Sequence, residues 1–367
     1  MKIIYYDYHF LIQKFGGVSR YYYEIITRLK KHNINYKILS FLSFNYYFKK
    51  TQSSGFYIYK SKYLKNLFLF INKFYFKFIC LILDPKIIHF TEYSDLILKY
   101  KKISILTVYD FILENHQNIN NKNSQKVLLK EECIKKANYI FTISNTVGKV
   151  LKEKYPNKRI FITPLGVNHN NFYNEKISDF TDILIPNKKY ILYVGSKNSY
   201  KNFNLLLNCF LKNSSINENF NLVLFGGENI INSKIDNNFL NKKIFQIYGG
   251  DNLLRKIYSN CSLYINTSLE EGFGLPLVEA MACKSPILCS DINVFREITE
   301  NSVYYFQPHS YHDLNNKIEM IVNKKFSLDE SIDKAYNISL KKNWENVSNS
   351  LINFYKVILE ENNANIK

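Results

Sequence analysis

Two carboxylates bracket a glycine loop and the expected start of a helix in Glu271-Gly272-Phe273-Gly274-Leu275-Pro276-Leu277-Val278-Glu279. The glycines lack a Cβ, so the backbone there can approach a ligand closely. Pro276 suits the first turn of a helix, where its missing N–H costs nothing. A glycine loop that leads into a helix N-terminus is a natural anion site. Because carboxylates repel phosphate, we expect Glu271 and Glu279 to bind hydroxyl groups, and a nucleotide sugar would supply phosphates, sugar and ribose together.

Further short motifs occur in a fixed order along the chain. They are Phe15-Gly16-Gly17-Val18-Ser19-Arg20-Tyr21, Phe141-Thr142-Ile143-Ser144, Pro164-Leu165-Gly166-Val167, Tyr193-Val194-Gly195-Ser196-Lys197, Tyr200-Lys201-Asn202-Phe203 and Leu224-Phe225-Gly226-Gly227. With the first stretch, they resemble the motifs of the family 4 retaining glycosyltransferases, which have the GT-B fold. The resemblance runs from about Gly16 to about Trp344. It implies an enzyme that transfers a sugar from a nucleotide-diphosphate sugar to an acceptor and keeps the anomeric configuration.

Strand-like and helix-like segments alternate along the 367 residues, which is typical of parallel sheets built from βαβ units. We expect strands at 2–7, 36–40, 87–90, 104–108, 139–144 and 160–163, and again at 190–194, 221–225, 244–247, 263–266 and 287–290. We expect helices at 20–31, 130–137, 145–154, 204–212, 253–259 and 276–283. The predicted fold class is therefore α/β, with two doubly wound Rossmann-like domains.

Length and composition set the domain boundaries. A chain of 367 residues accommodates two ordinary domains. We predict an N-terminal domain at 1–168, a linker rich in Asn and Asp at 169–188, and a C-terminal domain at 189–342. The GT-B resemblance implies that the two sheets face a cleft between the domains, and that a helix in 343–367 crosses back onto the first domain.

The second domain is expected to bind the donor. Lys197 and Lys201 follow a strand that ends at Gly195, and two lysines beside a glycine loop can neutralise a diphosphate as it leaves. The alternative is that both are solvated surface lysines. Family members usually have arginine where Lys197 stands, and lysine keeps the charge without the bidentate fork.

The remaining donor contacts are implied by the resemblance. Glu271 would bind the transferred sugar and Glu279 the ribose, although Glu279 could instead be a first-turn glutamate that complements the helix dipole. Backbone N–H groups and strand-end residues would complete the donor site: Gly272, Phe273, Gly274, Leu275, Tyr248 and Gly249.

The first domain is expected to bind the acceptor. Gly16 and Gly17 open a loop before a helix that begins near Arg20, and an ordinary strand-to-helix turn is the alternative interpretation. Asp110 follows a buried strand and is a candidate catalytic residue facing the cleft.

The residue before Asp110 departs from the family pattern. Members commonly have His-Asp where this chain has Tyr109-Asp110. A tyrosine, with an ordinary pKa of about 10, is a poor base at neutral pH. His89 or His116 could lie nearby, but a lone histidine is more often structural. This departure keeps open an inactive scaffold or binding subunit of a glycan-assembly complex.

The expected mechanism has no covalent nucleophile: a front-face route fits best, in which the leaving phosphate helps to deprotonate the acceptor hydroxyl. The chain has no Asp-x-Asp motif at a strand end, so we expect no obligatory metal and no cofactor besides the donor.

The motif Gly195-Ser196-Lys197-x-x-Tyr200-Lys201-Asn202 resembles members that use GDP-mannose. We therefore predict mannose transfer to a glycan or lipid-linked acceptor in bacterial surface polysaccharide synthesis, such as lipopolysaccharide or capsule. Another GT-B enzyme, an epimerase or a sucrose-synthase-like protein, is the alternative.

The charge balance is strongly basic. Forty-nine Lys and Arg against 31 Asp and Glu give a net charge of +18, which favours polyanionic partners. No helix-turn-helix, zinc-finger or RNA-binding signature accompanies it, so we expect no specific nucleic-acid binding.

The six cysteines have no metal-ligand spacing, and no signal peptide is evident. Both observations favour a cytoplasmic location of the protein.

The longest apolar run covers residues 67–83 and is interrupted by Asn72, Lys73 and Lys77. A spanning helix needs about 20 apolar residues, so we expect this run not to cross a membrane. It is either an amphipathic helix packed on the first sheet or a basic, aromatic helix resting on an anionic membrane surface. Three further lysines nearby favour the second interpretation: Lys60, Lys62 and Lys65.

Overall fold

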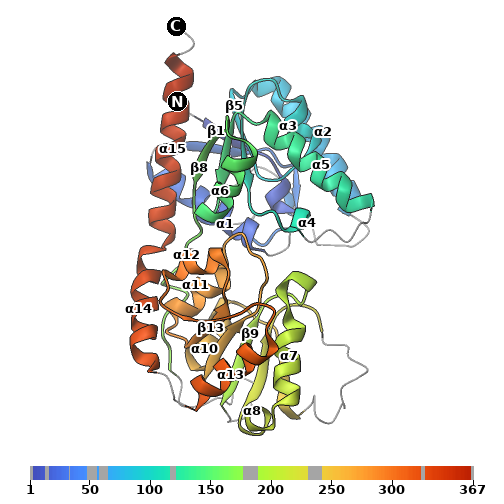
Figure 1. The fold of residues 1–367 in the computed structure, drawn as a ribbon. Helices are drawn as coiled ribbons and strands as arrows, with labels where there is room; N and C mark the ends of the chain where they lie inside the picture. Colours follow the sequence, from blue (N-terminus) through green and yellow to red (C-terminus); the bar gives the residue numbers. More distant parts are fainter. Residues whose placement is uncertain are drawn as a thin grey trace. The chain divides into compact units, whose positions relative to one another are not determined.

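A computed structural model of the chain describes residues 3–12, 16–32, 34–47, 56–57, 65–115, 121–176, 189–229, 242–323 and 327–364. Two compact units divide it (Figure 1): Met1–Leu165 with Trp344–Lys367, and Gly166–Asn343. Residues 169–176 are not a linker as expected, because they pack on the second unit. Phe172 is buried there, and Glu175 pairs with Arg255 at 2.6 Å. The rest of the predicted linker, 177–188, lies outside the described residues.

The first unit is built on a six-stranded parallel sheet of order β2-β1-β5-β6-β7-β8. Its strands are β1 (Ile3–Tyr6), β2 (Asn35–Ile38), β5 (Ile87–Phe90), β6 (Ile103–Val108), β7 (Tyr139–Thr142) and β8 (Arg159–Ile162). All four residues of β5 are buried, as expected for a parallel strand covered on both faces. The strand order reverses between β1 and β5, and ligands of open α/β sheets bind at such a switch point, outside the carboxyl ends of the strands.

Helices cover this sheet. They are α1 (Gly17–Leu29), α2 (Lys65–Leu83), α3 (Asp95–Lys99), α4 (Ile112–Asn115), α5 (Asn121–Lys136), α6 (Asn145–Lys154) and α15 (Trp344–Ala364), and a two-stranded sheet of β3 (Leu42–Ser43) and β4 (Phe56–Tyr57) lies beside them. Side chains of α2, α3, α5 and α6 share one core with β5 and β6. Helix α15 packs against α1, with the Trp344 and Tyr21 ring centroids 6.2 Å apart.

The second unit repeats the plan with a six-stranded parallel sheet of order β11-β10-β9-β12-β13-β14. Its strands are β9 (Tyr190–Val194), β10 (Asn221–Phe225), β11 (Ile244–Ile247), β12 (Leu263–Asn266), β13 (Ile287–Ser290) and β14 (Tyr304–Phe306). Its helices are the 3-10 turn η5 (Ser199–Lys201), α7 (Phe203–Lys212), α8 (Ser214–Asn219), α10 (Asp251–Asn260), α11 (Leu275–Ala282), α12 (Asn293–Thr299), α13 (Tyr311–Val322) and α14 (Leu328–Lys341). Here the switch point falls between β9 and β12.

Helix α2, which contains the apolar run, has one face packed on the protein and one face exposed. Asn72 is buried and its Oδ1 accepts from the backbone N of Phe41 at 2.7 Å, so one face packs into the first unit. The other face exposes Phe70, Phe74 and Phe78, each about 60% accessible. By length and composition alone, Asn66–Leu83 would pass as a membrane-spanning helix, and 17% of that stretch is buried.

His89 is a structural histidine. It is fully buried in β5, with Nδ1 2.5 Å from the Tyr355 hydroxyl of α15 and Nε2 2.7 Å from Thr107 Oγ1. Burial lowers the pKa of His89 to about 3, because the charged ring would lose its hydration. His89 therefore ties α15 to the sheet and stays neutral at physiological pH.

Acidification from pH 7 to pH 5 will destabilise the fold through His89. Its pKa is about 3 in the folded chain. An unfolded histidine titrates near 6.5, so between these values the unfolded chain binds the extra proton, and stability falls as pH falls. The loss attributable to this one group is about 2 kcal/mol. Chemical denaturation of wild type and His89→Gln at pH 7 and pH 5 measures it. The variant starts less stable but should lack this slope, and equal slopes would contradict the assignment.

Candidate functional site

The loops after β9 and β12 meet at the switch point of the second sheet. Thr267 Oγ1 donates to the carbonyl of Lys201 at 2.7 Å, and the Leu269 N–H donates to the carbonyl of Tyr200 at 2.8 Å. These two hydrogen bonds hold the segment containing Lys201 against the segment that leads into Glu271. Residues far apart in the sequence are thereby fixed at the sheet edge where ligands bind.

Lys201 and Glu271 form an ion pair at this edge, with Nζ 2.5 Å from Oε1. Ser268 Oγ donates to the same carboxylate oxygen at 2.8 Å. The side chains of Lys201 and Glu271 are only 19% and 11% exposed, so water screens the pair weakly. The structure thus brings into contact a cation and a carboxylate that the sequence assigned to different parts of the donor.

Lys197 lies beside the loop that follows β10 and the strand β11. Its Nζ donates to the carbonyl of Glu228 and, at 3.0 Å, to Gln246 Oε1. Its backbone N–H donates to Glu228 Oε2 at 2.8 Å. Burial lowers the pKa of Lys197, while Glu228 acts in the opposite direction. The neighbours of Lys197 are therefore different from those of the Lys201–Glu271 pair.

Glycines shape the loops around Lys197. Gly195, Gly226 and Gly227 all have positive φ, at 129°, 71° and 73°. A Cβ on Gly227 would lie 2.3 Å from the carbonyl oxygen of Gly195. Only glycine allows this contact, which fixes the loop after β9 against the loop after β10.

The bracketed glycine stretch forms the entry to α11, as its sequence predicts. Gly274 has φ +105° just before the helix, and a Cβ there would lie 2.8 Å from Phe295 Cε1. Gly272, Phe273 and Gly274 are buried, and Leu275 begins the helix. Glu279 is the fifth residue of α11 and only 4% exposed, so it is not a first-turn glutamate that complements the dipole.

The remaining donor candidates lie after β11. Tyr248 is 55% exposed, and its hydroxyl donates to Asn229 Oδ1. At Gly249 a Cβ would come within 2.6 Å of Leu253 Cδ2, so glycine lets α10 begin close to the strand end. An exposed aromatic ring at a strand end is suited to stacking on a base.

In the first unit, helix α1 begins at Gly17 rather than near Arg20, so only Gly16 belongs to the preceding loop. The Gly16 carbonyl accepts from the Arg20 N–H at 3.0 Å and from Ser19 Oγ at 3.0 Å, which extends the helix toward its N-terminus. Among the described residues, no atom outside its chain neighbours and its own helix backbone lies within 4 Å of a Cβ built on Gly17. Phe15, the first residue of this motif, lies outside the described residues.

Asp110 and Tyr109 follow β6. Asp110 Oδ1 accepts from the Ile112 N–H at 3.1 Å at the start of α4, and its carbonyl accepts from the buried Lys130. Tyr109 donates its hydroxyl hydrogen to the carbonyl of Thr91 at 2.7 Å. Burial raises the pKa of Tyr109 far above its ordinary value, so this side chain is no base. His89, the other candidate, has the structural role described above, and His116 lies outside the described residues.

Sequence reasoning missed a polar cluster at the switch point of the first sheet. Asp7 follows β1 directly, and Thr91 and Glu92 follow β5. The Asp7 carboxylate lies 2.7 Å from His9 Nδ1 and accepts from Thr91. The signal that could have revealed it is the Asp-x-His spacing at the end of the first strand.

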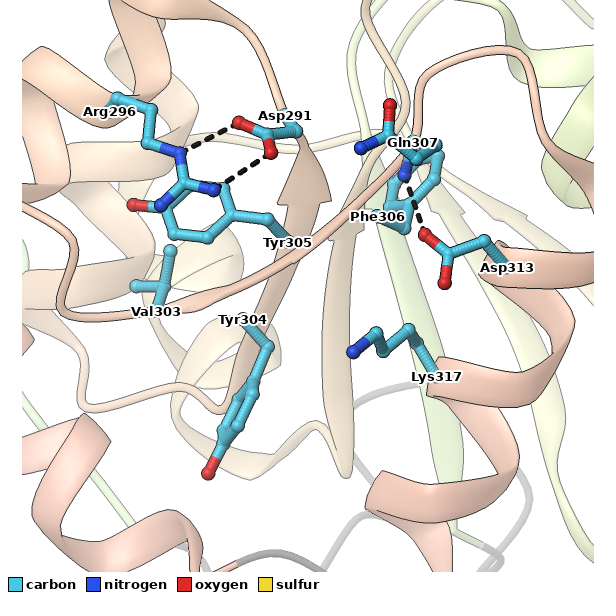
Figure 2. A pocket seen from close by; sticks show the side chains of 9 residues that line it. All are labelled: Asp291, Arg296, Val303, Tyr304, Tyr305, Phe306, Gln307, Asp313 and Lys317. Atoms are coloured by element: carbon cyan, nitrogen blue, oxygen red, sulfur yellow. Dashed lines mark hydrogen bonds and ion pairs between the residues drawn. The ribbon is translucent and has the colours of Figure 1, made fainter.

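A separate pocket of about 450 Å³ opens at the edge strand β14, between α12 and α13 (Figure 2). Its lining comprises Asp291, Arg296, Val303, Tyr304, Tyr305, Phe306, Gln307, Asp313 and Lys317, and includes none of the predicted site residues. Figure 2 shows Arg296 held by Asp291, with an Nε–Oδ1 distance of 2.7 Å. The guanidinium also lies 3.9 Å over the Tyr305 ring, so its charge already has protein partners.

The described residues contain no group of three or more His, Cys, Asp or Glu that could hold a metal ion. The six cysteines are free thiols, and five of them are buried. Burial raises the pKa of Cys133 to about 12, as for a small apolar core residue.

Residues 175–337 match the family model described as Glycosyl transferases group 1. Among curated proteins, the chain is similar to the O-antigen chain mannosyltransferase RfbU of Salmonella typhimurium, with 25% identity over 234 residues. That alignment covers 62% of this chain and 62% of RfbU, so the similarity spans somewhat under two thirds of the relative.

Solved structures extend the similarity to almost the whole chain. A sucrose-phosphate synthase from Thermosynechococcus elongatus superposes with a TM-score of 0.76 at 15% identity, covering 98% of this chain and 100% of that one. Anabaena HepE, solved with UDP and glucose, superposes with a TM-score of 0.71 at 13% identity, covering 97% and 100%. Such low identities show the fold alone. They confirm the predicted fold class, an α/β chain of the GT-B type with two doubly wound units.

Proposed function

We propose that this chain, whose residues 175–337 match the Glycosyl transferases group 1 family model, is a retaining glycosyltransferase. It would move a sugar, with mannose as first choice, from a nucleotide diphosphate to a hydroxyl of a glycan or lipid-linked acceptor. One observation carries the proposal: the Lys201–Glu271 pair, largely buried and 2.5 Å apart, stands at the switch point where an α/β sheet binds its ligand.

The chemistry follows from the charges of these residues. The bond between the anomeric carbon and the phosphate oxygen breaks, and its electron pair leaves with the diphosphate. Lys201 stabilises the negative charge that develops there, while Glu271 orients the ammonium and accepts from sugar hydroxyls. The acceptor oxygen bonds to the same face of the anomeric carbon, and its proton passes to the leaving phosphate. Lys197 and the N–H groups before α11 are further donor contacts, with Glu279 on the ribose and Asp110 on the acceptor side.

The choice of mannose rests on the sequence. RfbU is by name an O-antigen chain mannosyltransferase, and the motif from Gly195 to Asn202 resembles users of GDP-mannose. A role in O-antigen or related surface polysaccharide synthesis follows from the same similarity. HepE was solved with UDP and glucose, so a uridine donor is the alternative that the experiment must distinguish.

Product analysis tests this function. We would incubate the protein with GDP-mannose or UDP-glucose and p-nitrophenyl α-mannoside as surrogate acceptor, and read the new linkage by proton NMR. An α-linked product from the α-linked donor is expected. A β-linked product would contradict retention. The second candidate is an inactive scaffold, because this chain has Tyr109 where family members commonly have histidine. Donor binding without consumption of any donor would favour that candidate.

Metal removal is expected to leave turnover unchanged. The proposal assigns the leaving-group charge to Lys201 and Lys197, so it requires no divalent cation. We would measure the initial rate of GDP release from GDP-mannose before and after treatment with excess EDTA. Rates equal within twofold are expected. A rate abolished by EDTA and restored by Mg²⁺ would contradict this part of the proposal.

We further propose that the exposed face of α2 rests on an anionic membrane at its cytoplasmic side. The outward residues Phe70, Phe74 and Phe78 recur every four positions, so they lie on one face of the helix. Lys77 is exposed beside them, and the chain as a whole carries a charge of +18. The buried Asn72 ties the opposite face to the protein, so the helix would lie in the interface plane. A protein docked in this way would reach a lipid-linked acceptor in the same membrane.

Sedimentation with vesicles tests the membrane proposal. More protein should bind phosphatidylserine-containing vesicles than phosphatidylcholine vesicles, and the double substitution Phe74→Asp with Phe78→Asp should reduce binding at least about tenfold, since aromatic area is lost and negative charge is added. Leu128→Asp is the matched control, because Leu128 is also 60% exposed but lies on α5. Equal partitioning of the wild type between the two vesicle types would rule the contact out.

A further inference from the structure

The switch point of the first sheet carries a hydrogen-bonded cluster that has no role so far. Asp7 follows β1 and Thr91 follows β5, and both are fully buried. Thr91 donates twice to Asp7 Oδ1, from its backbone N at 3.0 Å and from Oγ1 at 2.5 Å. The second oxygen, Oδ2, lies 2.7 Å from Nδ1 of His9, whose side chain is 10% exposed. The cluster therefore joins the two strands between which ligands of such sheets bind.

The hydrogen bonds determine the tautomer of the neutral ring. A carboxylate offers only acceptor atoms, so Nδ1 of His9 must donate to Asp7. The lone pair of the neutral ring is then on Nε2, for which no hydrogen-bond partner is found in the described part of the chain. The Tyr8 ring stacks on the imidazole with centroids 4.3 Å apart, which fixes its plane. His9 is thus a rigid, oriented hydrogen-bond acceptor.

The surroundings of His9 are those of a site for hydroxyl groups. Glu92 is half-buried two residues beyond the end of β5, and burial raises the pKa of its carboxyl, while a hydrogen bond from the Tyr93 N–H lowers it. Glu92 follows Thr91 directly in the chain, so it adjoins the hydrogen-bonded cluster at the sheet edge. Tyr109 donates to the Thr91 carbonyl at 2.7 Å, so the position where family members have histidine adjoins the same cluster.

We propose that His9, oriented by Asp7 and Thr91, forms a subsite for the acceptor together with Glu92. The ligand it fits is a sugar hydroxyl, which donates to Nε2 of His9, while a neighbouring hydroxyl of the same ring donates to the Glu92 carboxyl. This inference rests on the proposed glycosyl transfer and adds the residues that bind the acceptor. Asp7 and Thr91 are positioning residues, because they act through the imidazole. The attacking hydroxyl and the route of its proton are unchanged.

Steady-state kinetics with GDP-mannose and p-nitrophenyl α-mannoside test the subsite. His9→Phe replaces the imidazole with an aromatic ring that can still stack on Tyr8 but has no nitrogen. We expect the KM for the mannoside to rise at least about tenfold through loss of the hydrogen bond, while kcat and the KM for GDP-mannose stay within about threefold. His9→Gln should recover most of the loss, because its amide oxygen can accept a hydrogen bond.

Three results would overturn the subsite: an unchanged KM for the mannoside in His9→Phe, a loss confined to kcat, or an equal loss of donor affinity that marks a structural role. If no nucleotide sugar raises the melting temperature of the wild type, the proposed function itself fails. If donors bind and only the mannoside KM is unaffected, the subsite alone fails.

A further measurement needs no turnover. Long-range proton–nitrogen correlation spectra of the ¹⁵N-labelled protein, taken where the ring is neutral, report the tautomer of His9. Protonation on Nδ1 is expected, and protonation on Nε2 would overturn the proposal.

Discussion

Lys201→Ala will lose at least about a hundredfold in turnover while staying folded, because the removed ammonium stabilises the leaving diphosphate and one such contact contributes about 3 kcal/mol to the transition state. Glu271 loses its cation but keeps the hydrogen bond from Ser268 at 2.8 Å. We therefore expect the free energy of unfolding to fall by no more than about 2 kcal/mol. Nucleotide release from the donor gives the rate, and chemical denaturation gives the stability.

A matched control exists in the same unit. Lys334 and Glu330 form an ion pair with the same Nζ–Oε1 distance of 2.5 Å, but their side chains are 63% and 73% exposed. Lys334→Ala should therefore leave both rate and stability nearly unchanged, because water screens an exposed ion pair. Lys201→Arg should keep part of the rate. Wild-type turnover in Lys201→Ala would remove Lys201 from the proposed mechanism.

Gly227→Ala will destabilise the second unit by more than about 2 kcal/mol, through a left-handed backbone and a clash with a rigid atom. Its φ is +73°, and the added Cβ would lie 2.3 Å from the Gly195 carbonyl oxygen. Because that oxygen belongs to backbone, the loop carrying Lys197 must move. Donor affinity should fall together with the melting temperature.

Gly226→Ala separates the two causes. Gly226 has nearly the same φ, +71°, but within the described ranges no atom beyond its chain neighbours lies within 4 Å of a Cβ built there. Gly226→Ala should therefore lower the free energy of unfolding only through the left-handed backbone, by about 1 kcal/mol. Equal unfolding free energies for the two variants would show that the contact with Gly195 does not constrain the loop.

The strands of the second unit were predictable because they are short apolar runs between turn residues. The expected bounds 190–194, 221–225, 244–247, 263–266 and 287–290 coincide with β9, β10, β11, β12 and β13. Strand β14 was missed because Tyr304–Phe306 has three residues and lies at the sheet edge, where the apolar signal is short. Helix α14 was missed because its first turn is acidic and only Ala335 and Ser339 are buried, so its apolar stripe is narrow.

The donor side of the site was more accessible to sequence reasoning than the acceptor side. Gly272, Gly274, Lys201 and Glu271 lie in contiguous motifs whose local chemistry suggests an anion and hydroxyl site. The direct Lys201–Glu271 contact was not foreseeable, because it joins segments seventy residues apart through the pairing of β9 with β12.

The acceptor side depends on long-range geometry. Asp7 and Thr91 are 84 residues apart and meet only because β1 pairs with β5. His9 has no family motif around it in the sequence. The helix boundary at Gly17 was also misjudged, since glycine usually indicates a loop while here it forms the first helical turn.

Thermal stabilisation by a panel of nucleotide sugars, measured on the wild type and on Lys201→Ala, tests the central claim most directly. A ligand that binds only the folded chain raises the melting temperature by mass action. The account predicts a clear rise with one member, GDP-mannose first, that is lost in Lys201→Ala and kept in Lys334→Ala. No rise with any nucleotide sugar in a folded sample, or the same rise in Lys201→Ala, would contradict the assignment of the donor site.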